Sequence, residues 1–170
     1  AGTVRAMGAS NYSAERLGEA LRTADELGLP RFTVVQPELN LLDRAQYEGP
    51  LQTLCIDEGL GVITYFSLAS GYLSGKYRSA DDFGKSPRGA SVKAYLEGKG
   101  PAMLAAMDRI AGETGATLSQ IALAWVAAQP GVTAPIASAT SVSQLDEILG
   151  SEALVLTAEQ LSALNDAGRG

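Results

Sequence analysis

The chain has 170 residues, of which 46% are hydrophobic and 19% are charged, and its formal net charge at pH 7 is −6. This length suffices for one domain with a hydrophobic core. The thirteen Lys and Arg residues form no basic block, which argues against a nucleic-acid surface. No apolar run approaches the ~20 residues of a membrane-spanning helix. We therefore expect neither nucleic acid nor a membrane as a partner.

The contents of cysteine and histidine limit the kinds of catalytic and metal site that this chain can form. Cys55 is the only cysteine and histidine is absent, which excludes Ser-His-Asp and Cys-His nucleophilic sites and most zinc sites. A single cysteine forms no internal disulfide, which is typical of a reducing compartment. The first residues also lack the basic leader and long apolar core of a signal peptide. We expect a cytoplasmic protein in which any catalysis uses Tyr, Lys or carboxylates.

Short apolar strands alternate with amphipathic helices four times along the chain. The predicted strands are 4–9, 32–36, 61–66 and 132–137, and the predicted helices are 14–27, 44–58, 101–114, 118–128, 141–149 and 158–167. Gly28 is placed to end the first helix, and Thr157 with Gln160 forms a capping-box pattern before the last. Residues 78–100 show no clear periodicity and are predicted to form a long loop.

Strands that are apolar on both faces and separated by helices are typical of a parallel sheet, so we predict the α/β class. Two common nucleotide-binding motifs are missing. No Gly-x-Gly-x-x-Gly follows the first strand, and Gly71, Gly75 and Lys76 lack the spacing of a P-loop. Four strand–helix units are too few for a closed (β/α)8 barrel, which takes about 250 residues. They fit either a small open sheet or half of a barrel.

Hydrogen-bonding side chains follow each predicted strand. They are Ser10 and Asn11 after the first strand, Gln36 and Asn40 after the second, Tyr65, Ser67 and Ser70 after the third, and Ser138, Thr140 and Ser141 after the fourth. Ligands of parallel α/β proteins bind at this carboxyl edge. The uncharged set suits an amide group, with phosphate oxygens at helix N-termini. The alternative explanation is that Ser and Asn only end strands and cap helices.

Four consecutive segments resemble motifs of the aldo-keto reductases. They are "GASNYS" (8–13), "VVQPELNLLDR" (34–44), "ITYFSLASGYLSGKYR" (63–78) and "PIASATSVSQLDEIL" (135–149). The resemblance covers essentially the whole chain. It implies that residues 1–170 are a single segment, the C-terminal half of the family's (β/α)8 barrel, with strands five to eight. Strands one to four would lie outside these residues.

The resemblance also implies a nicotinamide dinucleotide site. Ser10, Asn11 and Gln36 would hold the nicotinamide carboxamide, and Tyr65 would stack on the nicotinamide ring. The residues that would line the pyrophosphate are Phe66, Ser67, Leu68, Ala69 and Ser70, with Lys76 reaching over it. Arg88 would approach the adenosine phosphate. The last turn would hold the adenine ribose and any 2′-phosphate through Ser138, Thr140, Gln144 and Glu147.

Thr140 stands where Arg or Ser is frequent in the family, so the 2′-phosphate would lack one cation. We expect NADP as the cofactor, with NAD as the alternative. The implied reaction is reduction of a small aldehyde or ketone to an alcohol. The family's catalytic Asp, Tyr, Lys and His would belong to the other half, in agreement with the absence of histidine.

We therefore expect this chain to supply the cofactor-binding half of an oxidoreductase and to be inactive alone. It would pair with the missing N-terminal half or with another copy of itself. The alternative is a stand-alone half-barrel that binds a nucleotide or assembles without catalysis.

Overall fold

The fold is built on a four-stranded parallel sheet. The structure is a computed structural model and describes residues 2–85 and 92–169. The strands are β1 (Met7–Ser10), β2 (Phe32–Gln36), β3 (Gly61–Thr64) and β4 (Ala134–Pro135). They pair in the order β1-β2-β3-β4, so each strand lies beside its neighbour in sequence. The predicted α/β class with parallel strands is confirmed.

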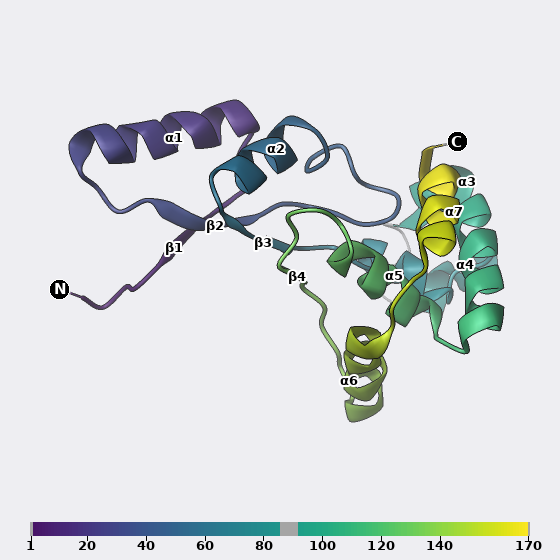
Figure 1. Cartoon of the computed structure of the whole chain (residues 1–170). Helices are drawn as coiled ribbons and strands as arrows, with labels where there is room; N and C mark the ends of the chain where they lie inside the picture. The colour runs from purple at the N-terminus through teal and green to yellow at the C-terminus, as the bar shows by residue number, and fades with distance from the viewer. Residues whose placement is uncertain (1, 86–91, 170) are drawn as a thin grey trace.

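Helices connect the strands and cover the sheet (Figure 1). The α-helices are α1 (Ala14–Leu27), α2 (Pro50–Asp57), α3 (Lys93–Glu97), α4 (Gly100–Thr114), α5 (Leu118–Ala127), α6 (Val142–Leu149) and α7 (Ala158–Arg169). Short 3-10 helices are η1 (Ala69–Ser74), η2 (Ala80–Lys85) and η4 (Gly150–Ala153). Within the described ranges, every helix is too short or too polar to cross a membrane.

The local signals in the sequence set several helix ends. The Ser13 hydroxyl accepts a hydrogen bond from the Arg16 N–H and caps α1. Gly28 ends this helix with a left-handed φ of 61°, which glycine adopts at little cost. The predicted capping box before α7 is present, because Thr157 and Gln160 each bond the other's backbone N–H.

The two faces of the sheet differ in burial. Ala9, Val35, Val62 and Thr64 are buried on the face that α1 and α2 cover. Their alternate neighbours on the opposite face, which include Ser10, Val34, Gln36 and Ile63, are half-buried or exposed. Helix α6 has no buried residue, and Figure 1 shows it projecting beyond β4. The described structure thus leaves one sheet face uncovered and the apolar side chains of Val142, Leu145 and Leu149 of α6 exposed.

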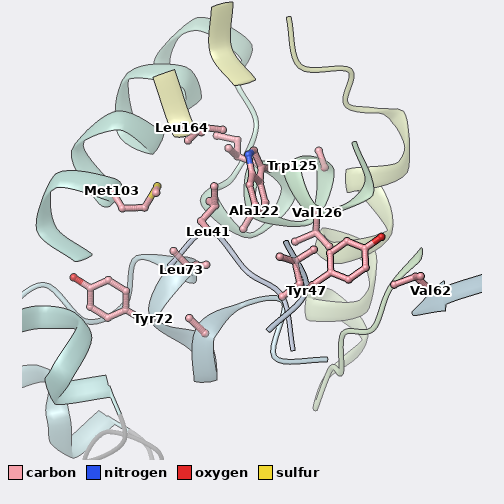
Figure 2. Packing of buried hydrophobic residues seen from close by; sticks show 14 of the residues in the cluster. Leu41, Tyr47, Val62, Tyr72, Leu73, Met103, Ala122, Trp125, Val126 and Leu164 are labelled. Carbon is pink, nitrogen blue, oxygen red and sulfur yellow. The ribbon is translucent and has the colours of Figure 1, made fainter. Parts of the chain in front are cut away.

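The hydrophobic core lies on the helical side (Figure 2). Trp125 of α5 is fully buried, and its indole N–H donates to the Asn165 side-chain oxygen of α7 at 3.1 Å. The guanidinium of Arg44 lies 4.7 Å from the centre of the Trp125 ring and donates to the same oxygen at 2.9 Å. Arg44 also pairs with Glu48. This cluster of Arg44, Trp125 and Asn165 joins α5, α7 and the segment before α2.

Several predicted boundaries were wrong. The first strand begins at Met7 rather than residue 4, because Val4 is exposed and pairing with β2 starts at Met7. The helix predicted at 44–58 begins at Pro50, since Tyr47 and Glu48 instead form turns on the Arg44 carbonyl. The strands predicted at 61–66 and 132–137 are shorter.

The segment 78–100, predicted as a long loop, contains η2 and α3, and α4 already begins within it at Gly100. Its hydrogen bonds explain part of this order. The Asp82 carboxylate accepts from the backbone N–H groups of Arg78 and Ser79, and Arg78 forms a two-point ion pair with Asp108 of α4. These local polar bonds support η2, whereas Val92 and Tyr95 hold the later turns through packing on the hydrophobic core.

Candidate cofactor-binding site

The carboxyl edge of the sheet brings Ser10 and Gln36 together. They are register partners at the ends of β1 and β2, and the Ser10 hydroxyl donates to the Gln36 carbonyl at 2.9 Å. Within the described residues, the Gln36 side-chain amide makes no hydrogen bond. A donor and an acceptor of one carboxamide thus remain available at the edge.

Asn11 and Tyr65 join the same edge across β2. The Tyr65 hydroxyl donates to the Asn11 side-chain oxygen at 2.8 Å. Asn11 has a left-handed φ of 60°, which asparagine tolerates better than most residues. Burial and then the Glu38 carboxylate raise the pKa of Tyr65, so its hydroxyl remains a donor at neutral pH. This bond fixes the ring of a half-buried tyrosine at the mouth of the sheet.

A strained turn follows β3. Phe66, Ala69 and Ser70 have φ values of 55°, 47° and 56°, and Gly71 follows at 91°. The left-handed region costs a non-glycine residue roughly 1–2 kcal/mol, so three such residues in one turn need support from their surroundings. The Phe66 carbonyl accepts from the Ala69 N–H at 2.7 Å, which closes the turn. We call residues 66–70 the β3 turn.

Three side chains of the β3 turn point into the protein. Ser67 and Ala69 are buried, and Leu68 packs against the core. The Ser67 hydroxyl lies 3.2 Å from the Thr64 hydroxyl and donates to the Thr64 carbonyl at 3.3 Å. Backbone groups, rather than these side chains, are therefore what this turn offers to a ligand.

Asn40 supports the β3 turn from the β2–α2 connection. Its amide nitrogen donates to the Phe66 carbonyl at 3.2 Å and to the Asp43 carboxylate at 3.0 Å. Its oxygen accepts from the N–H groups of Leu42 and Asp43. Asn40 is fully buried, and four bonds satisfy a side-chain amide. Sequence analysis placed Asn40 only as a polar residue beyond the second strand.

Asp43 extends this network to α3. Its Oδ2 atom accepts from the Tyr95 hydroxyl at 2.5 Å as well as from Asn40. Burial, with a further contribution from Asp43, raises the pKa of Tyr95. Burial and the charge of Asp43 raise the pKa of Glu38. Tyr95 escaped sequence analysis because it lies in the segment that was predicted as a loop.

Lys76 folds back over the β3 turn. Its ammonium nitrogen lies 5.1 Å from the centre of the Tyr77 ring. A Cβ atom at Gly71 would lie 3.1 Å from the same nitrogen, so the ammonium group lies close to the backbone of Gly71, the residue that follows the β3 turn. The structure therefore places one exposed cation against the turn that resemblance assigns to the pyrophosphate.

The residues after β4 form a separate hydrogen-bonded unit. The Gln144 side-chain oxygen accepts from the Thr140 N–H at 2.9 Å and from the Thr140 hydroxyl at 3.0 Å. Ser141 caps α6 by accepting from the Gln144 N–H. The Glu147 carbonyl accepts from Gln120 of α5, and Ser138 is exposed. Within the described residues no hydrogen bond joins this unit to Ser10, Gln36 or Tyr65, and Arg88 lies outside them.

Two cavities border the site. One of about 740 Å³ lies on the helical side of Tyr65, and its lining includes Asn11, Ser13, Glu15 and Glu48. The other, of about 520 Å³, lies beside the segment before α2. Acidic and basic side chains both line it, among them Asp43, Arg44, Lys99 and Arg169. Asn11 and Tyr65, which are joined by a hydrogen bond, therefore both line the first cavity.

This chain belongs to the Aldo/keto reductase family, whose model matches residues 1–169. It is 35% identical over 150 residues to a probable voltage-gated potassium channel subunit beta of Arabidopsis thaliana, covering 82% of this chain and 44% of that protein. It is 30% identical to the chloroplastic pyridoxal reductase of the same plant, covering 99% and 45%. Protein tas of Escherichia coli is 32% identical, with 96% and 48% covered.

The chain thus spans about half the length of the curated relatives it matches. The matches include proteins named as a pyridoxal reductase and as an aldo-keto reductase. The parallel sheet with flanking helices agrees with part of an aldo-keto reductase fold.

Proposed function

We propose that this chain is the cofactor-binding portion of an NAD(P)H-dependent aldo-keto reductase that reduces small aldehydes or ketones to alcohols. The observation that carries the proposal is the joined carboxyl edge. Ser10, Asn11, Gln36 and Tyr65 come from three strand ends, and the bonds Ser10–Gln36 and Asn11–Tyr65 hold them together. When bound, the nicotinamide supplies hydride to the carbonyl carbon.

The chemistry of this edge fits a nicotinamide carboxamide. The Gln36 side-chain amide offers an N–H donor and an oxygen acceptor. These can pair with the oxygen and the N–H of the nicotinamide's primary amide. The Ser10 hydroxyl donates its hydrogen to the backbone carbonyl of Gln36. The Ser10 oxygen is therefore left as an acceptor for an N–H group. The Asn11 oxygen is used by Tyr65, so Asn11 offers its nitrogen and at the same time orients the aromatic ring for stacking.

The dinucleotide's phosphates are proposed to lie over the β3 turn and beneath Lys76. The buried side chains of Ser67 and Ala69 support contacts through backbone N–H groups there. The turn of Ser138, Thr140, Gln144 and Glu147 is proposed to hold the adenosine end, with Arg88 nearby. We propose NADP as the preferred cofactor. NAD is the alternative, because Thr140 offers no cation to the 2′-phosphate that distinguishes NADP.

The catalytic proton donor is proposed to lie outside these residues. The open sheet face and the exposed apolar positions Val142, Leu145 and Leu149 of α6 support a second polypeptide segment that completes the barrel. That segment would be the missing N-terminal half or another copy of the chain. A cytoplasmic location is proposed from the buried, unpaired Cys55, although one relative is chloroplastic.

The site is tested by titrating the protein with NADPH and with NADH and measuring the heat of binding by isothermal titration calorimetry. The variant Gln36→Met removes the free carboxamide with little change in volume and is expected to weaken NADPH binding about tenfold, the cost of one or two hydrogen bonds. Gln129→Met is the matched control, since Gln129 follows α5 at the opposite end of the sheet and, within the described residues, its side chain bonds only the Trp125 carbonyl. It should bind as the unchanged protein does.

Binding that is equally tight in Gln36→Met would refute this placement of the nicotinamide. Failure of the unchanged, folded protein to bind either dinucleotide would refute the function. Carbonyl-dependent oxidation of NADPH by the purified chain alone would contradict the proposal that the proton donor lies elsewhere. Sedimentation of the purified chain distinguishes the two partners. A stable two-fold assembly favours a stand-alone half-barrel that pairs with a second copy, whereas aggregation or a bound N-terminal fragment favours the missing half as partner.

A further inference from the structure

We propose that Asn40, Asp43 and Tyr95 are positioning residues that fix the β3 turn from helix α3, and that dinucleotide affinity depends on this connection. The inference rests on the proposed function, because the β3 turn is the segment proposed to face the pyrophosphate. Its physical content is separate, since it concerns how one strained turn is held.

The strained conformation of the β3 turn is supported by contacts with other segments of the chain. Its three non-glycine residues at positive φ oppose the turn's conformation, and the Phe66 side chain is 50% exposed and adds little packing. The Phe66 carbonyl is the point at which outside support enters. It accepts from Ala69 within the turn and from Asn40 outside it. Loss of the Asn40 bond would leave the Phe66 carbonyl, where the turn begins, with only its local bond from Ala69.

Asn40 is itself fixed on every side. Its oxygen receives two backbone N–H groups, and its nitrogen is shared between Phe66 and Asp43. Rotation of this buried amide would leave several buried groups without partners, which is costly. Asn40 therefore transmits the position of Asp43 to the Phe66 carbonyl.

The position of Asp43 depends in turn on α3. One carboxylate oxygen accepts from both Tyr95 and Asn40, so the two donors compete for and jointly orient the same atom. The Tyr95 ring also packs against the ring of Tyr72, with centres 5.6 Å apart. A shift of α3 would therefore loosen Asp43 and, through Asn40, the β3 turn.

The experiment compares two tyrosine variants that each lose one hydroxyl bond. Tyr95→Phe removes the bond to Asp43, and Tyr47→Phe removes a bond of 2.9 Å from a buried tyrosine to the Pro130 carbonyl, away from the turn. Two readouts are measured in each: the NADPH dissociation constant and the hydrogen-exchange rates of the Ala69 and Gly71 amides. Tyr95→Phe should weaken binding about three- to tenfold and speed both exchange rates. Tyr47→Phe should change neither.

A second pair of variants separates geometry from charge. Asp43→Asn retains an oxygen that can accept from both Tyr95 and Asn40, so binding should stay within about twofold of the unchanged protein. Asp43→Ala removes the acceptor and should weaken binding more than Tyr95→Phe does. Rescue by asparagine and not by alanine is the signature of a positioning bond.

The outcomes are distinguishable. Unchanged exchange at Ala69 and Gly71 in both Tyr95→Phe and Asp43→Ala would overturn the network as a support of the turn. Faster exchange with unchanged affinity would overturn its link to the cofactor. If the unchanged protein binds no dinucleotide, the proposed function fails together with the link to affinity, and the exchange rates alone decide whether the network holds the turn.

Discussion

The cluster of Arg44, Trp125 and Asn165 allows a quantitative prediction for Asn165→Ala. One side-chain oxygen of Asn165 accepts from the Trp125 indole and from the Arg44 guanidinium. Trp125 is fully buried, and the Arg44 side chain is 10% exposed. Alanine would leave the Trp125 indole N–H without an acceptor and the Arg44 guanidinium with Glu48 as its remaining partner. A second Arg44 nitrogen, Nη1, is buried and already has no hydrogen-bond partner within the described structure.

A buried donor left unsatisfied costs about 1–3 kcal/mol, with the charged donor at the upper end. Because only the Trp125 donor loses its acceptor, we expect Asn165→Ala to lower the free energy of unfolding by about 2 kcal/mol. In a chain of this size, each kcal/mol shifts the melting temperature by about 2–4 °C, so the melting temperature should fall by about 4–8 °C. Urea unfolding followed by circular dichroism and thermal melting measure the two quantities.

The control for this prediction is Asn165→Asp. A carboxylate keeps an acceptor for both donors and adds a charge opposite to that of Arg44, so stability should stay within about 1 kcal/mol of the unchanged protein. A loss below about 0.5 kcal/mol in Asn165→Ala would refute the argument, because surface substitutions alone reach that size. Equal losses in the two variants would show that the oxygen acceptor is not what stabilises this position, because aspartate keeps both the shape of asparagine and an acceptor.

Two further predictions concern stability. Burial raises the pKa of the Cys55 thiol to about 11 from its ordinary 9.0, so the folded state keeps a proton that the unfolded state releases first. Stability should be full below pH 9 and fall as the pH rises toward 11. In Cys55→Val the fall between pH 9 and 10, measured by urea unfolding at each pH, should be smaller, and the remainder comes from tyrosines such as Tyr47, whose pKa burial also raises. A fall of unchanged size would contradict the assignment. Gly131→Ala places a Cβ at a φ of 81° and 2.6 Å from the Tyr47 hydroxyl, and should cost about 2–4 kcal/mol. Gly59→Ala, with φ of 63° and open space, should cost only about 1 kcal/mol, and equal costs would show that the contact with Tyr47 is relieved freely.

The elements that sequence analysis predicted well have strong local signals. Phe32–Gln36 is apolar and β-branched, and the strand has these bounds. Helix α1 has its cap at Ser13 and its stop at Gly28, and it too was predicted from end to end. Local signals alone decide such segments, because cap, periodicity and stop all favour the same conformation.

Other elements depend on distant contacts that a sequence pattern does not report. The predicted helix 44–58 included Arg44 and Tyr47, but the helix begins at Pro50. Tyr47 is buried and its hydroxyl donates to the Pro130 carbonyl, 83 residues away. The first strand is limited by where β2 offers a partner. Tertiary contacts therefore override local preference at both places.

The candidate site divides in the same way. Ser10, Asn11, Gln36 and Tyr65 could be grouped from sequence because parallel strands end at one edge. Their two mutual bonds, and the use of Asn11 to orient Tyr65, depend on side-chain geometry. The bond from Tyr95 to Asp43 joins residues 52 positions apart, one of them in a segment without periodicity, so no pattern could have indicated it.

The uncovered face of the sheet has a consequence for thermodynamic measurements. A polypeptide that binds there in the folded state, but not in the unfolded state, stabilises the fold in proportion to the logarithm of its concentration. The melting temperature of this chain is then a property of the mixture rather than of one molecule. Dilution series should accompany any comparison of its variants.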